Sequence, residues 1–150
     1  MTSASADEAR GASREEGAAS TRLLVADDDR VMRLRLKSMF AQERAFELVG
    51  VAADAEEAIR LATEHRPDAA LVDVNMPGGG GAAVVREMQR ISPGTAVVIL
   101  SSLDERNLVL KLLEEGAMSY VVKGAQPEEI FEAIRRSIDA HAFLDSQRPD

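Results

Sequence analysis

The sequence predicts a doubly wound α/β fold built around a five-stranded parallel sheet. Two observations lead to this prediction. From Thr21 onward, short apolar runs alternate five times with longer amphipathic segments, which is the pattern of parallel strands joined by crossover helices. The apolar runs are also nearly continuous, with little polar alternation, as expected for strands that are covered by helices on both faces.

The strand candidates are the five apolar runs themselves. In chain order they are Leu23–Ala26, Phe46–Ala52, Ala69–Val74, Ala96–Leu100 and Ser119–Val122. Right-handed crossovers bring the carboxyl ends of all parallel strands to one edge of the sheet. The natural closure of five such repeats is a flavodoxin-like sheet with the strand order 2-1-3-4-5.

Capping signals and apolar stripes predict the intervening helices. Asp29 caps the first helix, and Asp54 with Glu57 forms a capping-box-like start for the second. Gly116 suits a left-handed end of the fourth helix, and Pro127 with two following acids opens the fifth. The apolar stripes are Met32, Leu36, Met39 and Phe40 in the first helix, Val84, Val85, Met88 and Ile91 in the third, and Ile130, Ile134 and Ile138 in the fifth.

We expect one ordered domain over residues 21–142, flanked by two tails. Residues 1–20 are rich in Ala, Ser, Gly and Glu and carry no large apolar side chain after Met1. Such a segment cannot bury enough surface to offset its ordering entropy, so it is predicted to be a disordered tail. Residues 143–150 are predicted to form a short C-terminal tail, too short for a second domain.

Composition excludes several classes of function. The 150 residues include no cysteine, which excludes disulfides and thiolate metal sites. The formal net charge of −8 disfavours binding to nucleic-acid phosphates or anionic lipid. No apolar run approaches the roughly 20 residues of a membrane span, and the first 20 residues lack the apolar region of a secretory signal. We expect a cytoplasmic protein whose partners are proteins and ions, without direct contact to nucleic acid or membrane.

Four of the five predicted strands end in a chemically notable residue. These residues are Asp27–Asp29 after the first strand, Asp73 in the third, Ser101–Ser102 after the fourth and Lys123 after the fifth. One such residue alone is commonly a helix cap or solvated surface. Four at the same edge of one sheet, where doubly wound folds bind ligands, predict a functional site.

Charge indicates what this site holds. Asp27, Asp28 and Asp73 within a few ångströms would repel one another, and some would take up protons. A hard divalent cation removes that conflict, and Mg²⁺ fits best because it prefers oxygen ligands and keeps several waters. Zinc is disfavoured because the two histidines, His65 and His141, lie away from this edge.

At this point the residues resemble a known family, the receiver domains of bacterial two-component response regulators. The resemblance covers about Arg22 to Ala140, nearly the whole predicted domain. It rests on four segments in the right order and spacing: Leu24 to Asp28, Pro67 to Gly78, Val98 to Ser102 and Gly116 to Lys123. Each segment alone is weak, whereas four in order are specific.

The resemblance implies that Asp73 accepts a phosphoryl group in a Mg²⁺-dependent, in-line transfer from phosphohistidine. It also implies the metal ligands. Asp28 and Asp73 would bind Mg²⁺ directly, Asp27 would act mainly through coordinated water, and Asn75 would contribute its backbone carbonyl. Catalysis would need little beyond positioning and charge neutralisation, so the protein would act only on its own aspartate and is not expected to be a general enzyme.

The resemblance further implies a switch. Ser101 and Lys123 would bind phosphoryl oxygens, and movement of Ser101 would open space for Tyr120. Such a change biases an equilibrium between two packings and would alter the face formed by the fourth helix, the fifth strand and the fifth helix. The implied partners are a histidine kinase or histidine phosphotransfer protein and a downstream protein target, and a homodimer is left open.

The glycine run after the third strand departs from the family pattern. Gly78–Gly81 is an unbroken glycine run where the family usually carries an acid before the last glycine, so the third helix is expected to begin loosely. A phosphate-cradling loop is disfavoured, because no Lys-Ser/Thr pair follows the run.

Three other functions compete with the single-domain receiver. A haloacid-type phosphohydrolase would need a second Asp two positions after the nucleophile, where this chain has Asn75. A truncated DNA-binding regulator is suggested by residues 141–145, which resemble the linker that follows such domains. A degenerate receiver acting as a fixed dimerisation surface is disfavoured by the intact Asp28, Asp73, Ser101 and Lys123.

Overall fold

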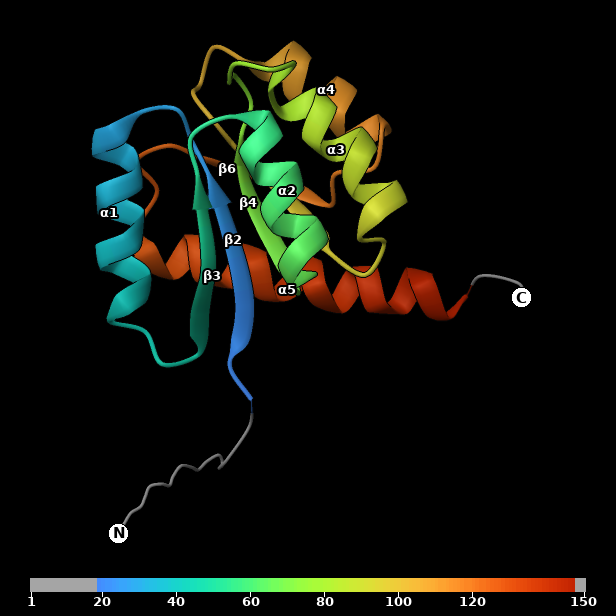
Figure 1. Cartoon of the computed structure of the whole chain (residues 1–150), viewed down its shortest axis with the longest axis horizontal. Coiled ribbons are helices and arrows are strands. Elements are labelled where there is room, and N and C mark those ends of the chain that lie inside the picture. The colour runs from blue at the N-terminus through green and yellow to red at the C-terminus, as the bar shows by residue number, and fades with distance from the viewer. Residues whose placement is uncertain (1–18, 148–150) are drawn as a thin grey trace, which may run out of the picture.

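The computed structural model describes residues 19–147 as one sheet with helices on both of its faces (Figure 1). The strands are β2 (Thr21–Ala26), β3 (Phe46–Ala52), β4 (Ala69–Asp73), β5 (Ala96–Ser101) and β6 (Ser119–Val122). The helices are α1 (Arg30–Ala41), α2 (Ala55–His65), α3 (Gly80–Ile91), α4 (Arg106–Glu114) and α5 (Pro127–Ser146). All strand pairs are parallel, and the sheet order is β3-β2-β4-β5-β6. Counted along the chain this is 2-1-3-4-5, so the predicted fold is confirmed.

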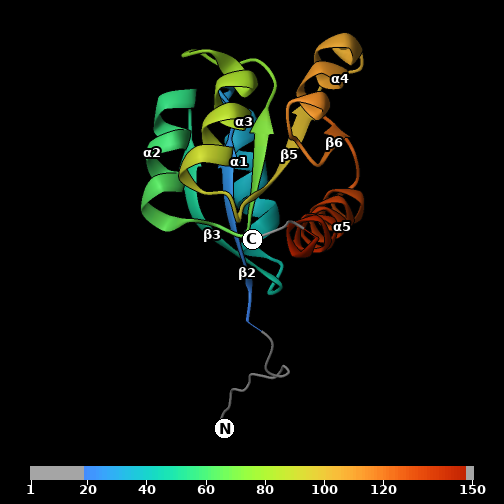
Figure 2. The same ribbon diagram turned by 90° about the vertical axis from the view of Figure 1, so that its right-hand side faces the viewer.

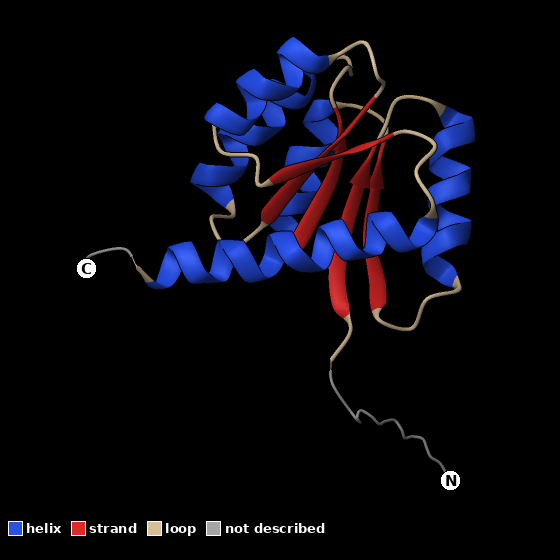
Figure 3. Ribbon diagram, turned by 180° about the vertical axis from the view of Figure 1, so that it is seen from behind, coloured by secondary structure: helices blue, strands red, loops and turns tan. Residues whose placement is uncertain are grey.

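Alternate strand residues divide the core between the two faces. One face of the sheet carries Leu24, Val72 and Ile99 and packs against α2, α3 and α4. The opposite face carries Leu23, Leu71 and Leu100 and packs against α1 and α5. Figures 2 and 3 show these two layers from the side and from behind. Because the central strands β4 and β5 are buried along their whole length, their apolar runs are continuous.

The predicted capping residues act as caps. The Asp29 side chain accepts a hydrogen bond from the Val31 backbone N–H at the start of α1, and Asp54 accepts one from the Glu57 N–H at the start of α2. Gly116 follows α4 with φ of +126°, a conformation that favours glycine. The Ala117 and Gly116 N–H groups bond the Leu112 and Leu113 carbonyls, respectively, which is the pattern of a Schellman end.

The glycine run forms the turn between β4 and α3. Gly78, Gly79 and Gly80 all have positive φ. At Gly80 a Cβ atom would lie 2.9 Å from the Val74 carbonyl oxygen, so the close approach requires a residue without a side chain. The run therefore serves a tight turn that places α3 directly behind the end of β4.

Helix α5 is longer than the sequence predicted. It runs from Pro127 to Ser146, so residues 143–146 of the predicted C-terminal tail continue the helix. Phe143 and Leu144 are exposed on this last turn. The segment contains no helix-breaking residue, and its exposed side chains form no buried apolar stripe that would mark the end of the helix in the sequence. The predicted N-terminal tail, apart from its last two residues, lies outside the described residues.

Within residues 19–147 no helix combines the length and apolar character needed to cross a bilayer.

Candidate functional site

The carboxyl edge of the sheet brings the predicted site residues together. Asp27 directly follows β2, Asp73 ends β4, Ser101 ends β5 and Lys123 follows β6. Two backbone hydrogen bonds extend the ladder beyond the strands: the Asp27 N–H donates to the Ala52 carbonyl at 3.0 Å and the Lys123 N–H to the Ser101 carbonyl at 2.7 Å. Because the ladder fixes these backbones, both side chains start from rigid positions at the edge.

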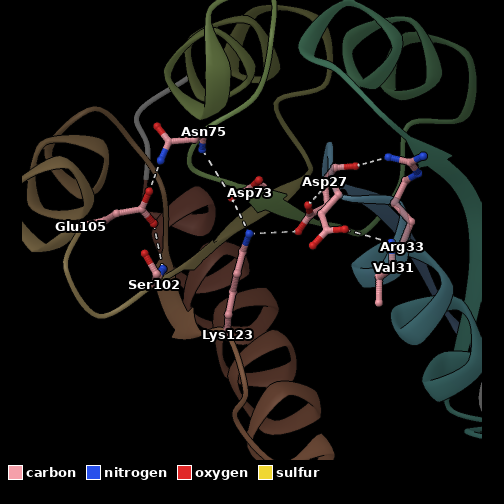
Figure 4. Close-up of polar contacts among 9 residues, drawn as sticks. Asp27, Val31, Arg33, Asp73, Asn75, Ser102, Glu105 and Lys123 are labelled. Atoms are coloured by element: carbon pink, nitrogen blue, oxygen red, sulfur yellow. Dashed lines mark hydrogen bonds and ion pairs between the residues drawn. The ribbon is translucent and has the colours of Figure 1, made fainter.

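Lys123 is the only cation among the described residues that lies within ion-pair distance of the two buried aspartates. Its Nζ atom lies 3.2 Å from Asp73 Oδ1 and 3.4 Å from Asp27 Oδ2, between the two carboxylates (Figure 4). Asp27 is fully buried and Asp73 is 2% exposed. Two buried negative charges therefore share one positive charge, which leaves the pair under-compensated.

The two carboxylate oxygens of Asp27 differ in their hydrogen-bond partners. Its Oδ1 atom accepts a hydrogen bond from the Asp29 backbone N–H at 2.8 Å. Its buried Oδ2 atom accepts no hydrogen bond from any described residue. In the described part of the chain its one partner is the Lys123 ammonium at 3.4 Å, which Asp73 shares. A buried carboxylate oxygen that accepts no hydrogen bond and has only half of one cation is under-compensated, and a further cation or water would offset that cost.

Burial and neighbouring charges shift the pKa values of both Asp73 and Lys123. Burial, followed by repulsion from Asp27, raises the pKa of Asp73 from 3.8 to about 6, against the opposing attraction of Lys123. For Lys123, burial alone lowers the pKa, but the two carboxylates outweigh it and hold the pKa above its ordinary value of 10.5. Lys123 therefore stays charged near neutral pH, while Asp73 has an unusually basic carboxylate.

Asp28 completes a group of three carboxylates. One oxygen each from Asp27, Asp28 and Asp73 lies within 4.8 Å of the others, and Asp28 is exposed whereas the other two are buried. An all-oxygen donor set that is open to water on one side suits Mg²⁺, which keeps several waters. The residues present therefore fit this ion. Asp29, the fourth acid of the sequence cluster, is engaged as the α1 cap.

Of the remaining predicted residues, Asn75 and Ser101 lie at the same edge as Asp73, and Tyr120 lies outside the buried cluster. The Asn75 backbone N–H donates to Asp73 Oδ1 at 3.4 Å, which places Asn75 beside Asp73. Ser101 is 2% exposed at the end of β5, in the same edge. Tyr120, in contrast, is 51% exposed on the edge strand β6 and lies outside the buried cluster. Among the described residues no hydrogen bond joins Tyr120 to Ser101, although the two lie on the paired strands β6 and β5.

Two contributors were missed by sequence reasoning. Arg33 donates from Nη1 to the Asp27 backbone carbonyl at 2.9 Å, which fixes the loop before α1. Glu105 bonds both Asn75 and the Ser102 backbone N–H on the other side of the site. The spacing Ser102-x-x-Glu105 before an apolar run is a capping-box signal that could have indicated the second contact. No sequence signal indicated the first contact.

Comparison with known proteins is consistent with this site. The profile of the response regulator receiver domain matches residues 23–135. The response regulator GacA of Pseudomonas aeruginosa is 34% identical over 126 residues, which are 84% of this chain and 59% of GacA. This chain therefore spans less than two thirds of that relative.

Two solved structures are similar to this chain. The receiver domain of the putative response regulator NarL from Mycobacterium tuberculosis superposes with a TM-score of 0.76 at 30% identity, covering 81% of this chain and 98% of that one. A CheX–CheY–BeF₃–Mg²⁺ complex from Borrelia burgdorferi has a TM-score of 0.68 at 25% identity, covering 75% and 84% of the two chains.

Proposed function

Because this chain belongs to the response regulator receiver family, we propose that Asp73 is the residue that accepts the phosphoryl group. The observation that supports this most is the position of Asp73: its buried carboxylate lies 3.2 Å from Lys123 Nζ and within 4.8 Å of two further carboxylates. A basic carboxylate next to a fixed cation and a metal-binding acid is equipped for nucleophilic attack on phosphorus.

The transfer is a displacement at phosphorus. A carboxylate oxygen of Asp73 forms the new P–O bond while the P–N bond of a phosphohistidine breaks, and the imidazole nitrogen leaves with the electron pair and is protonated by solvent. Lys123 neutralises charge that develops on the phosphoryl oxygens, and the Ser101 hydroxyl donates to one of them. The protein acts on its own aspartate and on no other substrate.

A bound Mg²⁺ supplies charge neutralisation and orients the phosphoryl oxygens. Asp28 and Asp73 are the proposed direct ligands, the Asn75 backbone carbonyl a third, and Asp27 acts through coordinated water. The Oδ2 atom of Asp27 supports that last role, because it accepts no hydrogen bond from the described residues and a metal-bound water is a hydrogen-bond donor. The similar Borrelia complex, which contains BeF₃ and Mg²⁺, supports the assignment by similarity.

The proposed output is a change at the face formed by α4, β6 and α5. Movement of Ser101 toward the phosphoryl group leaves room for Tyr120, whose ring is half exposed on β6. Leu110 on α4 is also exposed, at 51%, so this face offers apolar surface to a protein partner. The phosphodonor is a histidine kinase or histidine phosphotransfer protein, and the reaction takes place in the cytoplasm.

A second function is supported by the length of GacA, of which this chain matches 59%. In that case the chain is the receiver part of a DNA-binding regulator, and the extended α5 leads toward the output domain.

Incubation with Mg²⁺ and an acyl phosphate tests the proposal. Intact-mass measurement should show one added phosphoryl group that hydroxylamine removes, since an acyl phosphate on Asp73 reacts with that nucleophile. The Asp73→Asn variant should remain unmodified, with Asp68→Asn as the matched control that is still labelled. Labelling that persists in Asp73→Asn would show that another residue is the acceptor.

A further inference from the structure

Glu105, the last residue of the β5–α4 loop, links this loop to the β4–α3 loop beside Asp73. It lies at the start of α4, and its carboxylate accepts two hydrogen bonds, one at each oxygen. Oε1 accepts from the Ser102 backbone N–H at 2.8 Å, within the β5–α4 loop. Oε2 accepts from the Asn75 side-chain amide, which belongs to the β4–α3 loop. Figure 4 shows this carboxylate between its two donors. We call these three residues the Glu105 clasp.

The clasp reaches Asp73 through one residue. The Asn75 backbone N–H donates to Asp73 Oδ1, while the Asn75 side chain donates to Glu105. Asn75 therefore contacts the acceptor with its backbone and the start of α4 with its side chain. Asp73 and Glu105 are thus two hydrogen bonds apart, with Asn75 as the residue between them.

The β5–α4 loop has few other attachments. Leu103, its large apolar residue, is 84% exposed and anchors nothing in the core. The Ser102 hydroxyl bonds Asp104, within the same loop. Because apolar packing is missing here, the bond from the Asn75 amide to Glu105 is the side-chain contact that ties this loop to the β4–α3 loop. The bond from the Ser102 N–H holds the Glu105 side chain in place within its own loop.

We propose that Glu105 is a positioning residue that holds the β5–α4 loop and the start of α4 in the resting arrangement, and that phosphorylation of Asp73 opens the Glu105 clasp. This inference rests on the proposed function of Asp73. The physical reason is competition: a phosphoryl group carries about −1.5 to −2 charges and three acceptor oxygens. These oxygens repel the Glu105 carboxylate and compete with it for the N–H donors at the same edge.

Substitutions at Glu105 separate its bonds from its charge. Glu105→Ala removes both acceptors. Glu105→Gln removes the charge, but one amide oxygen can still accept from Ser102, and the amide nitrogen can donate to a turned Asn75 side chain. Glu114→Ala is the matched control, because it deletes an exposed acid of the same helix outside the clasp.

Amide hydrogen exchange in the unmodified protein tests the clasp itself. Exchange of the Ser102 N–H should be at least about tenfold faster in Glu105→Ala than in the wild type, since a hydrogen bond to a charged acceptor is lost. Glu105→Gln should restore most of the protection, and Glu114→Ala should match the wild type. Equal Ser102 exchange in wild type and Glu105→Ala would overturn the clasp.

Binding of beryllofluoride with Mg²⁺, followed by NMR, tests the coupling to Asp73. Because the clasp opposes the phosphorylated arrangement, Glu105→Ala should bind the analogue about three- to tenfold more tightly than the wild type. Glu105→Gln should fall between the two, and it carries the test if the alanine variant does not fold. Equal or weaker binding by both variants would refute the coupling. A wild type that binds no beryllofluoride would instead refute the proposed function of Asp73.

Discussion

The two ends of the sheet differ in how well their polar groups are supplied with partners. At the amino end, the Thr95 hydroxyl donates to the Pro67 carbonyl at 2.6 Å and lies 2.7 Å from the Ser92 hydroxyl. Arg22 at the same end donates to the His65 carbonyl at 2.7 Å, and its backbone N–H bonds Asp68. At the carboxyl end, Asp27 Oδ2 is buried and accepts no hydrogen bond from the described residues, and Asp27 and Asp73 share one cation, Lys123.

The polar groups at the amino end have hydrogen-bond partners and stabilise the fold. The carboxylates at the carboxyl end lack sufficient partners within the protein and are suited to bind a ligand. Satisfied buried hydrogen bonds fix the loops at the amino end and leave nothing free to react. Under-compensated carboxylates destabilise the unliganded protein, and such local conflicts concentrate at functional sites. Removal of a buried polar group should therefore lower the free energy of unfolding when the group lies at the amino end. It should raise that free energy when the group is a carboxylate of the carboxyl end.

The largest effect is expected in the pH dependence of stability. The pKa of Asp73 is about 6 in the folded protein and 3.8 as an ordinary carboxyl, so the folded state binds the proton more tightly. The contribution of Asp73 to stability is thus fully present below about pH 4 and is lost as pH rises through 6. The shift corresponds to about 3 kcal/mol. Urea unfolding without Mg²⁺ from pH 4 to pH 7.5 measures it.

Asp73→Asn provides the reference for that experiment, because it has no carboxyl at the site but keeps all other titrating groups. The wild type should lose about 3 kcal/mol relative to this variant across the pH window. Parallel stability curves for the two proteins would contradict the raised pKa of Asp73.

At the amino end, Thr95→Val should destabilise the protein, whereas removal of the Asp73 carboxyl should stabilise it near neutral pH. Valine keeps the shape of threonine but leaves the buried Pro67 carbonyl and Ser92 hydroxyl without their partner. The free energy of unfolding should fall by about 1 to 3 kcal/mol, independent of pH between 5 and 8, as measured by urea denaturation. A neutral or stabilising result would remove the contrast between the two ends.

Within the carboxyl end, the neighbouring residues Asp28 and Asp29 should differ in their effect on Mg²⁺ binding. Asp28→Ala should weaken Mg²⁺ binding at least about tenfold, because it removes a negative charge from the group of three carboxylates. Asp29→Ala should leave Mg²⁺ affinity nearly unchanged but cost about 1 kcal/mol of stability, because Asp29 caps α1. Magnesium titration followed by NMR measures the affinities. Equal losses of affinity in the two variants would refute the assignment of Asp28 as the ligand.

Local sequence patterns predicted the fold well because each one reports a local physical requirement. The strands β3 and β6 were predicted with their observed bounds, and the caps Asp29, Asp54 and Gly116 have their expected roles. The end of α5 was not predictable in this way. Its last turn projects beyond the sheet with Phe143 and Leu144 exposed, so no burial pattern marks its length (Figure 3).

The site was predictable where residues follow strands and unpredictable where loops meet. Strand order alone brings Asp27, Asp73 and Lys123 to one edge. The contact between Asn75 and Glu105 joins two loops that are 30 residues apart, and its geometry depends on side-chain directions that no periodicity encodes. The half-exposed position of Tyr120 likewise depends on the packing of the edge strand.

Titration of the Asp73 side-chain carboxyl by ¹³C NMR, with and without Mg²⁺, tests the central claim most directly. The pKa of Asp73 should lie near 6 without the ion, and saturating Mg²⁺ should lower it well below that value, because a bound cation stabilises the carboxylate. A carboxyl that titrates at its ordinary pKa of 3.8 without the ion, and that does not respond to Mg²⁺, would contradict the account.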